Sequence, residues 1–480
     1  MRAAPRAAPN ATVLRGRAKR KPRVGVPGHP AMAASTSAPF FTVDETALAD
    51  LNAFLRDARE LVCARDSNAK KKTPRAERVT LVLGNEAADL DSVACAISLA
   101  YALHEANDDA SRAYVPVVCV PREDFSLRAD ARWLLESVGV DVDALTFAGE
   151  VAFGDASGPI VDDRLRLVLV DHNALASKSE YASFATAVDA VVDHHDDEKK
   201  YPATAAAAVV PTGSCATLVA EPLVLDQSAL AVYSETATRV FRETGPPTRL
   251  NAGDPRAALL LAAVLLDTQN LNSRATRVHA RDEAVAPILA SLSSTGDPAS
   301  FHDELKRKRF DQSGLSPRDL LRRDYKQWRF VGAENKAWDV GVASFGVPLG
   351  NMAGDARAIR DACESFARER SVDALALMCA FDDEDSSSRA FRRQFAICFF
   401  DKTGDSDDVR FICASPLQAR LVEPGGALSV ALGGLEPVAD ETARDAFGGF
   451  AFEQGDPKGS RKKAQPALAA FFENASSSRR

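Results

Sequence analysis

Three apolar runs of this sequence are each followed at once by acids, amides or histidines. In chain order, the residues that follow them are Asn85, Asp89 and Asp91, then Asp171, His172 and Asn173, then Asp193, His194 and His195. A fourth apolar run ends in Asp267. Each position alone is a weak indication of a site, because Asp and Asn also cap helices. The chain has only seven histidines, however, and three of them stand beside aspartates at these positions, which favours one shared site.

The apolar runs themselves predict the scaffold that holds these residues. Continuous, β-branched-rich runs occupy residues 79–83, 115–120, 165–170 and 188–192, and each is followed by polar residues and a helical pattern. Continuous rather than alternating runs indicate strands covered on both faces, which is typical of a parallel α/β sheet. Functional groups in such sheets gather at the carboxyl ends of the strands, so we expect the acids and histidines to meet in one crevice.

Several carboxylates in one crevice repel one another unless cations lie between them. Carboxylates with imidazole fit Mg2+ or Mn2+, with the imidazole favouring Mn2+ or Co2+, and the lack of thiolate there argues against structural zinc. Two ions bridged by a shared aspartate would activate a water molecule and neutralise charge on a transferring phosphoryl group. The residues therefore favour metal-dependent hydrolysis of a phosphate ester or anhydride.

The length of 480 residues predicts two or three domains. We expect a basic leader over 1–43, disordered or similar to a transit peptide, then a metal-binding domain over 44–290, a linker over 291–317 and a second domain over 318–480. An amphipathic helix is predicted from Asp44 onward. The second domain begins with a helical pattern and continues with short strands near 340–345, 374–381, 394–400 and 409–414, so we predict a smaller mixed α/β unit.

The spaced acids and histidines resemble the four motifs of the DHH phosphoesterase superfamily. These are Asn85-x3-Asp89-x-Asp91, Asp171-His172-Asn173, Asp193-His194-His195 and Asp267, and residues 212–217 resemble the Gly-Ser-x-x-Thr element that follows the third motif. Residues 324–326 (Asp-Tyr-Lys) and 460–466 (Ser-Arg-Lys-Lys-Ala-Gln-Pro) resemble the DHHA2 domain of exopolyphosphatases, prune-like proteins and family II inorganic pyrophosphatases. The resemblance runs from about 81 to 472 and implies an active site in the cleft between the two domains.

The resemblance also implies a role for each residue. One metal site would use Asp89 and Asp171, and a second would use Asp91, Asp171, His194 and Asp267, with Asp171 bridging two ions and Asn85 as a further candidate ligand. The catalytic residues would be Asp171, His195, which faces the water or phosphate, and Asp193, which supports the histidines. Loop capping explains Asp193 equally well. Lys326, Arg461, Lys462 and Lys463 would bind phosphate, and Arg274 and Arg277 could extend this basic wall.

The first residue of the first motif distinguishes the branches of this superfamily. Family II pyrophosphatases begin the first motif with His, whereas Asn85 stands there in this chain, as in the exopolyphosphatase and prune branch. We therefore predict a metal-dependent exopolyphosphatase that releases orthophosphate from the end of inorganic polyphosphate. The alternatives are an inorganic pyrophosphatase and a prune-like regulatory protein with phosphodiesterase activity on cyclic or short nucleotides. The complete third motif favours hydrolysis over the regulatory role.

Charge and hydropathy disfavour other classes. The net charge is −8, but the first 43 residues contain eight basic residues and no acid, so the remainder has 51 basic and 67 acidic residues, or −16. An acidic body disfavours a nucleic-acid partner, and no apolar run approaches the roughly 18 residues of a membrane helix. The eight cysteines never pair as C-x-x-C and are typical of a reducing compartment. We expect a cytoplasmic protein, with a chloroplast or mitochondrion as the alternative, and no oligomeric state is predicted.

Overall fold

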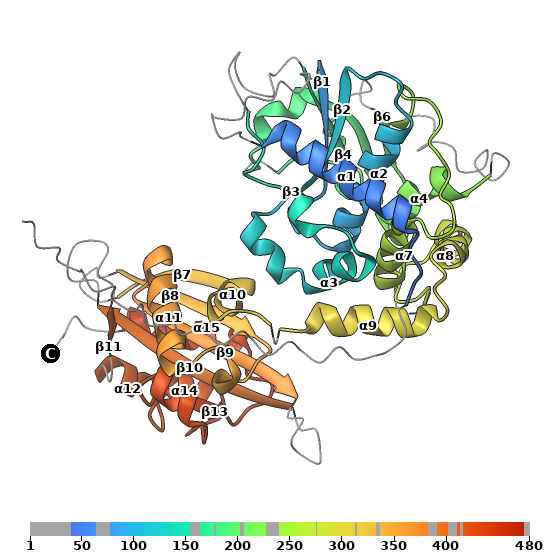
Figure 1. Cartoon of the computed structure of the whole chain (residues 1–480). Coiled ribbons are helices and arrows are strands. Elements are labelled where there is room, and N and C mark those ends of the chain that lie inside the picture. Colours follow the sequence, from blue (N-terminus) through green and yellow to red (C-terminus); the bar gives the residue numbers. More distant parts are fainter. Residues whose placement is uncertain are drawn as a thin grey trace, which may run out of the picture. The chain divides into compact units, whose positions relative to one another are not determined.

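The computed structural model contains two sheets, each with its own helices (Figure 1). It describes residues 40–63, 77–153, 164–176, 179–201, 206–226, 240–274, 276–312, 314–332, 337–382, 391–401, 410–412 and 416–474. No helix in these stretches is long and apolar enough to cross a membrane.

The first domain is built on a six-stranded sheet in which all neighbouring strands are parallel. Its strands are β1 (Arg78–Leu83), β2 (Arg112–Val118), β3 (Thr146–Phe147), β4 (Leu165–Val170), β5 (Val188–Asp193) and β6 (Ala206–Val209), in the order β3-β2-β1-β4-β5-β6. β1, β2, β4 and β5 correspond to the four continuous apolar runs, so the predicted parallel sheet is confirmed. β3 and β6 are too short to give a sequence pattern of their own.

Seven helices among the described residues pack with this sheet. They are α1 (Glu45–Val62), α2 (Leu90–Glu105), α3 (Ala129–Val138), α4 (Cys215–Val224), α7 (Pro255–Asp267), α8 (Ala280–Leu292) and α9 (Pro298–Phe310). Asp44 begins α1 by accepting the backbone N–H groups of Thr46 and Ala47. α2 lies against β1 and β2 and also packs on α4 and α7, which buries nearly all its side chains. Burial all round explains why α2, α4 and α7 are apolar on almost every face.

The strand order turns back between β1 and β4, and this reversal creates the place for a site. From β1 the chain continues to β2 and β3 on one side, and it then crosses to β4 on the other. In parallel sheets such a reversal leaves a crevice at the carboxyl ends of the two central strands. The first motif follows β1, Asp171 follows β4, and Asp193 ends β5, so the topology places three motifs at one edge.

The second domain is a seven-stranded mixed sheet, as predicted. Its strands are β7 (Tyr325–Val331), β8 (Ala337–Phe345), β9 (Ala374–Asp382), β10 (Phe391–Asp401), β11 (Arg410–Ile412), β12 (Leu435–Pro437) and β13 (Ala451–Gln454). The order is β12-β13-β10-β9-β8-β7, with β11 paired to β10. β8 and β9 are parallel, whereas the other described pairs are antiparallel.

Helices cover both faces of this second sheet. They are α10 (Pro317–Arg323), α11 (Ala356–Arg370), α12 (Pro416–Val422), α13 (Ala427–Ala431), α14 (Glu441–Ala446) and α15 (Arg461–Glu473). Successive residues of β9 enter different cores: Leu375 and Leu377 join one cluster, while Ala376 and Met378 join the other. This alternation makes the domain a three-layer unit with a core on each side of the sheet.

The expected linker over 291–317 contains a helix, α9. Asp297 caps it and Pro298 occupies its first turn, so the residues that suggested a linker instead begin a helix. Phe301 and Leu305, one turn apart, are fully buried in the core of the first domain. The unstructured part of the connection is therefore shorter than the composition suggests.

The expected leader ends earlier than residue 43. Phe40 and Phe41 pack against Phe301, with ring centroids 5.5 Å and 5.8 Å apart, and the backbone of Thr42 donates to Ser293. These contacts place residues 40–43 with the first domain. The remainder of the expected leader, residues 1–39, lies outside the described residues.

Candidate metal centre

Asp171 lies at the centre of the candidate site and has an unusual backbone. Its φ is 62°, a left-handed conformation that few residue types other than Gly, Asn and Asp adopt readily. Its backbone N–H donates to Val192, which keeps the end of β4 joined to β5. Side-chain Oδ2 accepts from Ser92 Oγ at 2.7 Å and Asn85 Nδ2 at 2.8 Å, while Oδ1 lies 3.3 Å from His194 Nε2. The two oxygens of Asp171 therefore face the first and third motifs respectively.

The first motif folds into the start of α2. Asp89 is the N-cap of this helix and accepts the N–H of Ser92 through Oδ1 at 3.2 Å. Asn85 accepts the N–H groups of Ala87 and Ala88 through its Oδ1, so the amide nitrogen of Asn85 is the group that faces Asp171. Asn85 therefore acts here as a donor to Asp171, and its amide oxygen is engaged in the turn.

Asp91 is held by the beginning of another helix. Its carboxylate is buried, and it accepts the N–H of Cys215 at 2.7 Å and the N–H of Ala216 at 2.8 Å. Both N–H groups belong to the first turn of α4, where backbone donors lack partners within the helix and the dipole favours an anion. This contact gives a structural reason for the Gly-Ser-x-x-Thr element, because that element forms the turn before α4.

The turn before α4 is fixed by a buried carboxylate from α8. Asp282 accepts from Gly213 N at 2.9 Å and Thr217 Oγ1 at 2.6 Å, and it also caps α8 through His279 N at 2.7 Å. A Cβ atom on Gly213 would lie 2.5 Å from Thr268 Cγ2 and 2.8 Å from Asp282 Oδ2. Only glycine fits this close approach, so Gly213 and Asp282 indirectly set the position of Asp91.

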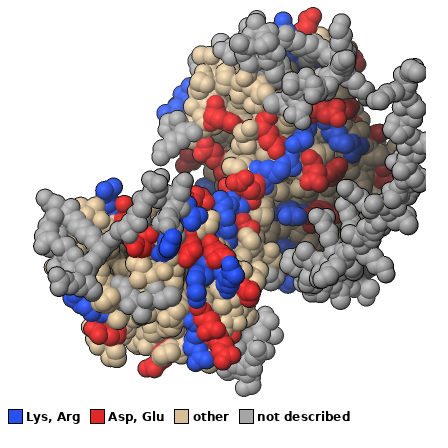
Figure 2. All heavy atoms as spheres, turned by 60° about the vertical axis from the view of Figure 1, so that its left-hand side comes forward, with Lys and Arg blue, Asp and Glu red and all other residues tan. Residues whose placement is uncertain are grey.

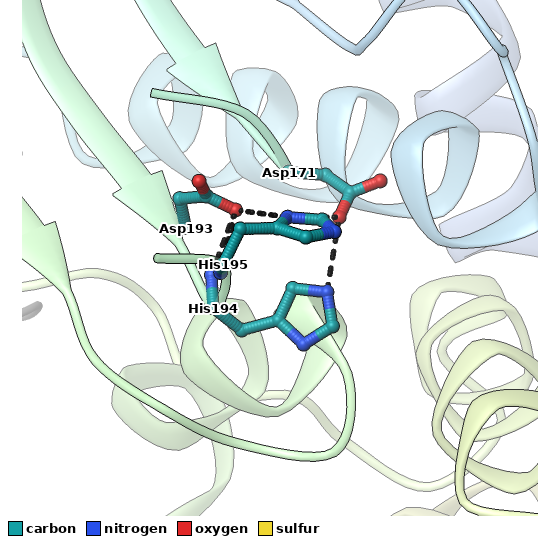
Figure 3. Close-up of side chains that lie close together, drawn as sticks. All are labelled: Asp171, Asp193, His194 and His195. Carbon is teal, nitrogen blue, oxygen red and sulfur yellow. Dashed lines mark hydrogen bonds and ion pairs between the residues drawn. The ribbon is translucent and has the colours of Figure 1, made fainter. Parts of the chain in front are cut away.

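Asp193 organises the third motif. It is fully buried, and its Oδ1 accepts from the backbone of His194 and from His195 Nδ1, both at 2.8 Å. Its Oδ2 accepts from Asn173 Nδ2. Figure 3 shows the ring of His195 between the carboxylates of Asp193 and Asp171, with the ring of His194 turned toward Asp171. The same carboxylate thus caps the loop and orients His195, which are the two roles that the sequence left open.

The carboxylates are crowded, and their pKa values are shifted accordingly. Burial, followed by the neighbouring charge of Asp91, raises the pKa of Asp171 to about 7 and also raises the pKa of Asp89. The same causes raise the pKa of Asp267 well above its usual value. Burial opposes protonation of His194, but its hydrogen bond to Asp171 and the charge of Asp91 raise its pKa to about 9. Such a site favours bound positive charge.

The structure places two of the five expected metal ligands, Asp171 and His194, in one compact group with Asp193 and His195. Ligand atoms of Asp171, Asp193, His194 and His195 lie within 4.8 Å of one another. His194 Nε2 also lies 4.0 Å from Asp91 Oδ2, and a hydrogen bond with Asp91 contributes to the raised pKa of Asp267 at the end of α7. Asp89 interacts electrostatically with Asp91. The carboxylate and imidazole donors fit the divalent cation that the sequence predicts.

Two residues of the second motif have structural contacts. His172 donates through Nδ1 to Val170 O of its own strand at 2.9 Å, and His172 also lines a cavity of about 190 Å³ beside Asn85. Asn173 is buried and donates to Asp193 and to Asp196 O. Asn173 therefore supports the third motif, whereas His172 is hydrogen-bonded to its own strand.

The predicted phosphate-binding residues of the second domain include one close pair. Arg461 begins α15 and donates to Asp324 Oδ1 at 2.9 Å. Asp324 lies two residues before Lys326, which is exposed on β7. Lys463 is paired with Asp456 at 2.6 Å, and Lys462 is exposed. In the first domain, Arg274 and Arg277 are exposed beyond the end of α7. The role of these residues in binding phosphate stays a prediction.

Sequence reasoning missed three contributors. Ser92 holds Asp171 and accepts the N–H of Asn85 at 3.0 Å, and Asp282 fixes the turn before α4. Arg128 donates to Ala87 O in the loop of the first motif. A serine directly after Asp91 carries a weak signal at the start of a helix, but the contacts of Asp282 and Arg128 depend on chain segments far away in the sequence.

Two family models match the chain in the predicted order. The model described as "DHH family, N-terminal domain" matches residues 79–241, and the "DHHA2 domain" matches residues 303–471. The chain is a DHH–DHHA2 protein. The predicted family is thus confirmed for both domains of this DHH–DHHA2 chain.

Relatives of this DHH–DHHA2 protein carry hydrolase names. "Exopolyphosphatase PRUNE1" of Rattus norvegicus is 31% identical over 302 residues, which are 63% of this chain and 59% of that protein. "Putative exopolyphosphatase" of Schizosaccharomyces pombe is 28% identical over 347 residues, or 71% of this chain and 82% of that protein. "Probable manganese-dependent inorganic pyrophosphatase" of Archaeoglobus fulgidus is 25% identical over 260 residues, or 53% and 69%. The chain spans between about half and three fifths of the length of the PRUNE1 relatives.

Proposed function

We propose that this protein is a metal-dependent exopolyphosphatase that releases orthophosphate from the end of inorganic polyphosphate. The observation that carries the proposal is the placement of Asp171, whose two oxygens face the first and third motifs within a group of buried acids. An aspartate in this position is suited to bridge two cations. Names of two relatives, in rat and fission yeast, agree with the activity.

The residues that would hold the ions are Asp89, Asp91, Asp171, His194 and Asp267. Bound divalent ions would neutralise the charge that develops on a transferring phosphoryl group and lower the pKa of water. Mn2+ is the first choice because imidazole is among the ligands and one relative is named as manganese-dependent, while Mg2+ and Co2+ are the alternatives. We propose two ions, because these five ligands are divided between two sites that share Asp171 as the bridging ligand.

His195 and Asp193 would act on the substrate side of the site. His195 is 57% exposed, and its Nδ1 is engaged by Asp193. With the proton on Nδ1, the buried carboxylate fixes the ring orientation and leaves Nε2 to face a phosphate oxygen or the attacking water. Asp193 also accepts a hydrogen bond from Asn173, which fixes its carboxylate. The ring of His195 is therefore held in place before substrate binds.

Positive side chains of the DHHA2 domain would hold the phosphate chain. Lys326, Arg461, Lys462 and Lys463 are the proposed group, acting in a cleft between the two domains. Arg461 is already fixed by Asp324, and exposed Lys326 and Lys462 can reach an anion without first breaking an ion pair that the structure records. Ammonium and guanidinium groups suit the repeated anionic units of polyphosphate.

A substrate panel on the purified protein tests the proposal. Pyrophosphate, tripolyphosphate, long polyphosphate and a cyclic nucleotide are each supplied with Mg2+, Mn2+ or Co2+, and orthophosphate release is measured. We expect the highest kcat/KM on tripolyphosphate or longer chains, and a fall of about a hundredfold to a thousandfold in Asp171→Asn. Asp189→Asn is the matched control and should keep full activity, because Asp189 is a half-buried aspartate on β5 that pairs with Arg242.

Two results would redirect the proposal. Release from pyrophosphate alone would identify an inorganic pyrophosphatase in place of an exopolyphosphatase. Cleavage of the cyclic nucleotide without orthophosphate release from any polyphosphate would instead favour the prune-like phosphodiesterase. No hydrolysis of any substrate with any of the three metals would overturn the enzymatic function.

A further inference from the structure

Three arginines gather near the first motif, and the function proposed above uses none of them. Arg128 stands at the end of the 3-10 helix Arg122–Leu127, Arg309 lies in the last turn of α9, and Arg323 is the last residue of α10. They come from positions far apart in the sequence, so no motif reveals them. We refer to Arg128, Arg309 and Arg323 as the arginine cluster.

The arginine cluster is connected to the metal-binding loop. Arg128 donates through Nε to Ala87 O, two residues before Asp89, and Asp89 and Arg128 interact electrostatically. Arg309 also interacts with Asp89. Arg128 thus contacts the loop of the first motif, and both Arg128 and Arg309 lie within electrostatic range of Asp89, a proposed metal ligand.

The members of the cluster also lie close to one another. Arg309 Nε is 4.0 Å from Asp130 Oδ2, and Arg323 donates through Nη2 to Arg309 O at 3.1 Å. Asp130 interacts electrostatically with Arg128 and Arg323 as well. One buried carboxylate is therefore shared among three guanidinium groups.

This arrangement leaves positive charge uncompensated. Burial and the charges of Arg128 and Arg309 lower the pKa of Arg323, although Asp130 opposes the shift. In addition, Nη1 of Arg323 is buried and has no hydrogen-bond partner among the described residues. A buried guanidinium donor without an acceptor is unfavourable, so a bound anion that accepts a hydrogen bond from it would be stabilised.

We propose that the arginine cluster binds a phosphate group of the polyphosphate chain that lies beyond the pair of groups nearest the metal ions. The inference rests on the proposed function and adds a second contact for the substrate. Guanidinium groups bind phosphate oxygens through paired N–H donors, which makes a cluster of three near the first motif well suited to a chain of three or more phosphate groups. A pyrophosphate would end before reaching the cluster, so the cluster would select longer substrates.

Binding of non-hydrolysable analogues tests the inference without measuring catalysis. Imidotriphosphate and imidodiphosphate are titrated into the Mg2+-loaded full-length protein by isothermal calorimetry, for wild type and Arg309→Gln. We expect Kd for imidotriphosphate to rise about tenfold in Arg309→Gln, as expected for the loss of one charged hydrogen bond, and Kd for imidodiphosphate to stay unchanged. The Kd of Arg309→Lys for imidotriphosphate should lie between those of wild type and Arg309→Gln, because lysine keeps the positive charge.

Arg307→Gln is the matched control, since Arg307 lies on the same helix, is 59% exposed and pairs with Glu304. It should bind both analogues as wild type does. Arg323→Gln provides a second test of the cluster and should resemble Arg309→Gln.

The outcomes separate the inference from the proposed function. Equal binding of imidotriphosphate by wild type, Arg309→Gln and Arg323→Gln would overturn the inference, and so would a wild-type protein that does not bind this analogue. If the substrate panel shows no polyphosphate hydrolysis but the arginine variants still weaken imidotriphosphate binding, the cluster is a phosphate site and the proposed activity is wrong. If hydrolysis occurs and the variants bind normally, only the cluster is wrong.

Discussion

At the scale of single residues, Ser92 tests whether the Asp171 carboxylate must be held from behind. Its hydroxyl donates to Asp171 at 2.7 Å and accepts the N–H of Asn85 at 3.0 Å. Ser92→Ala should weaken Mn2+ binding about tenfold, because groups that orient a metal ligand typically contribute that much. The measurement is the Mn2+ affinity by isothermal titration calorimetry.

Ser98→Ala provides the control for this change. Ser98 lies on the same helix and is buried, but its Oγ has no hydrogen-bond partner among the described residues. It should bind Mn2+ as wild type does. If Ser92→Ala and Ser98→Ala have the same affinity, the hydroxyl of Ser92 does not orient Asp171.

Asn85 is the residue that distinguishes this chain from family II pyrophosphatases. Its amide nitrogen donates to Asp171 Oδ2 at 2.8 Å, so a side chain at this position reaches the carboxylate that we propose to bind metal. Asn85→His should strengthen Mn2+ binding about tenfold, since imidazole is a better ligand than an amide. Unchanged or weaker Mn2+ affinity by the same calorimetric titration would show that the departure in the first motif does not set metal affinity.

How far the site could be predicted depends on where each contact comes from. Asp171, Asp193 and His194 were predictable because their positions follow from strand ends, which apolar runs mark directly. The donor role of Asn85 was not, because it depends on which atom of the amide faces Asp171. The contacts of Arg128 and Asp282 join segments separated by 41 to 69 residues, and spacing alone carries no signal for such pairs.

At the scale of elements, the turn between β6 and α4 should be intolerant of any side chain at Gly213. Gly213→Ala places a Cβ 2.5 Å from Thr268 Cγ2 and 2.9 Å from Arg277 O. The turn must then shift, which should destabilise the protein by about 1–3 kcal/mol and weaken Mn2+ binding, because α4 also holds Asp91.

Gly296→Ala is the matched control for this glycine. A Cβ on Gly296 has no heavy atom within 4 Å, so urea unfolding of this variant should match wild type. Loss of stability in Gly213→Ala with unchanged Mn2+ affinity would show that the turn and the metal ligand are not coupled.

The 3-10 helix Arg122–Leu127 depends on an ion pair whose strength should vary with pH. Arg122 donates to both carboxylate oxygens of Glu150, at 2.6 Å and 3.0 Å, and to Leu145 O. Burial alone would raise the pKa of Glu150. The hydrogen bonds from Arg122 and from the N–H of Phe147 outweigh burial and lower this pKa. A lowered pKa in the folded state means that ionised Glu150 stabilises the protein above the unfolded-state pKa of about 4.3, and that this stability is lost as pH falls through the folded pKa.

Glu150→Gln should therefore destabilise the protein by ~1 kcal/mol at pH 7, and the difference should shrink as the pH approaches 4 and below. Urea unfolding of both proteins at pH 7, 5 and 4 measures it. Glu136→Gln is the control, because Glu136 and its partner Arg132 are both about half exposed. This change should lower the free energy of unfolding by less at every pH. If Glu150→Gln lowers the free energy of unfolding by the same amount at all three pH values, the charge of Glu150 does not stabilise the fold.

Elements were predictable where burial and period agree. β4 matched its expected bounds because all but one residue of this strand is buried and the apolar run is continuous. β12 and β13 were missed because they contain three and four residues and mix polar with apolar side chains. α9 was missed because its mean character is polar and only Phe301, His302 and Leu305 are buried, which is too narrow a stripe to outweigh the Ser, Gly and Pro around it.

At the scale of the whole molecule, removal of the metal should lower thermal stability as well as activity. The carboxylates of Asp89, Asp171 and Asp267 have raised pKa values because they are buried together, so the folded state without cations contains unrelieved repulsion. Chelation with EDTA should abolish hydrolysis and lower Tm by a few degrees, and Mn2+ in excess should restore both, since a ligand that binds only the folded state stabilises it.

Asp171→Asn should show a smaller Tm increase with Mn2+ than wild type, whereas Asp189→Asn should show the full increase. An equal Tm in EDTA and in excess Mn2+ would mean that these carboxylates do not bind metal in the folded protein.

The charge of the molecule is distributed more evenly than its total suggests. On the face shown in Figure 2, Lys and Arg side chains lie among Asp and Glu side chains. Part of the acidic excess lies inside the first domain, where Asp91, Asp171 and Asp193 are buried. Net charge therefore gave no information about where an anionic substrate would bind.

The hydrogen bonds from α4 to Asp91 have a consequence for how the protein folds. They join residues 124 and 125 positions apart, and the contact between Asp171 and Ser92 spans 79. Closing such long loops is slow and happens only when most of the parallel sheet is already assembled. We therefore expect the proposed ligands to come together too late for an ion to nucleate the domain, so that a bound metal would mainly slow unfolding. On this expectation, folding would create the proposed metal site, and the metal would not direct folding.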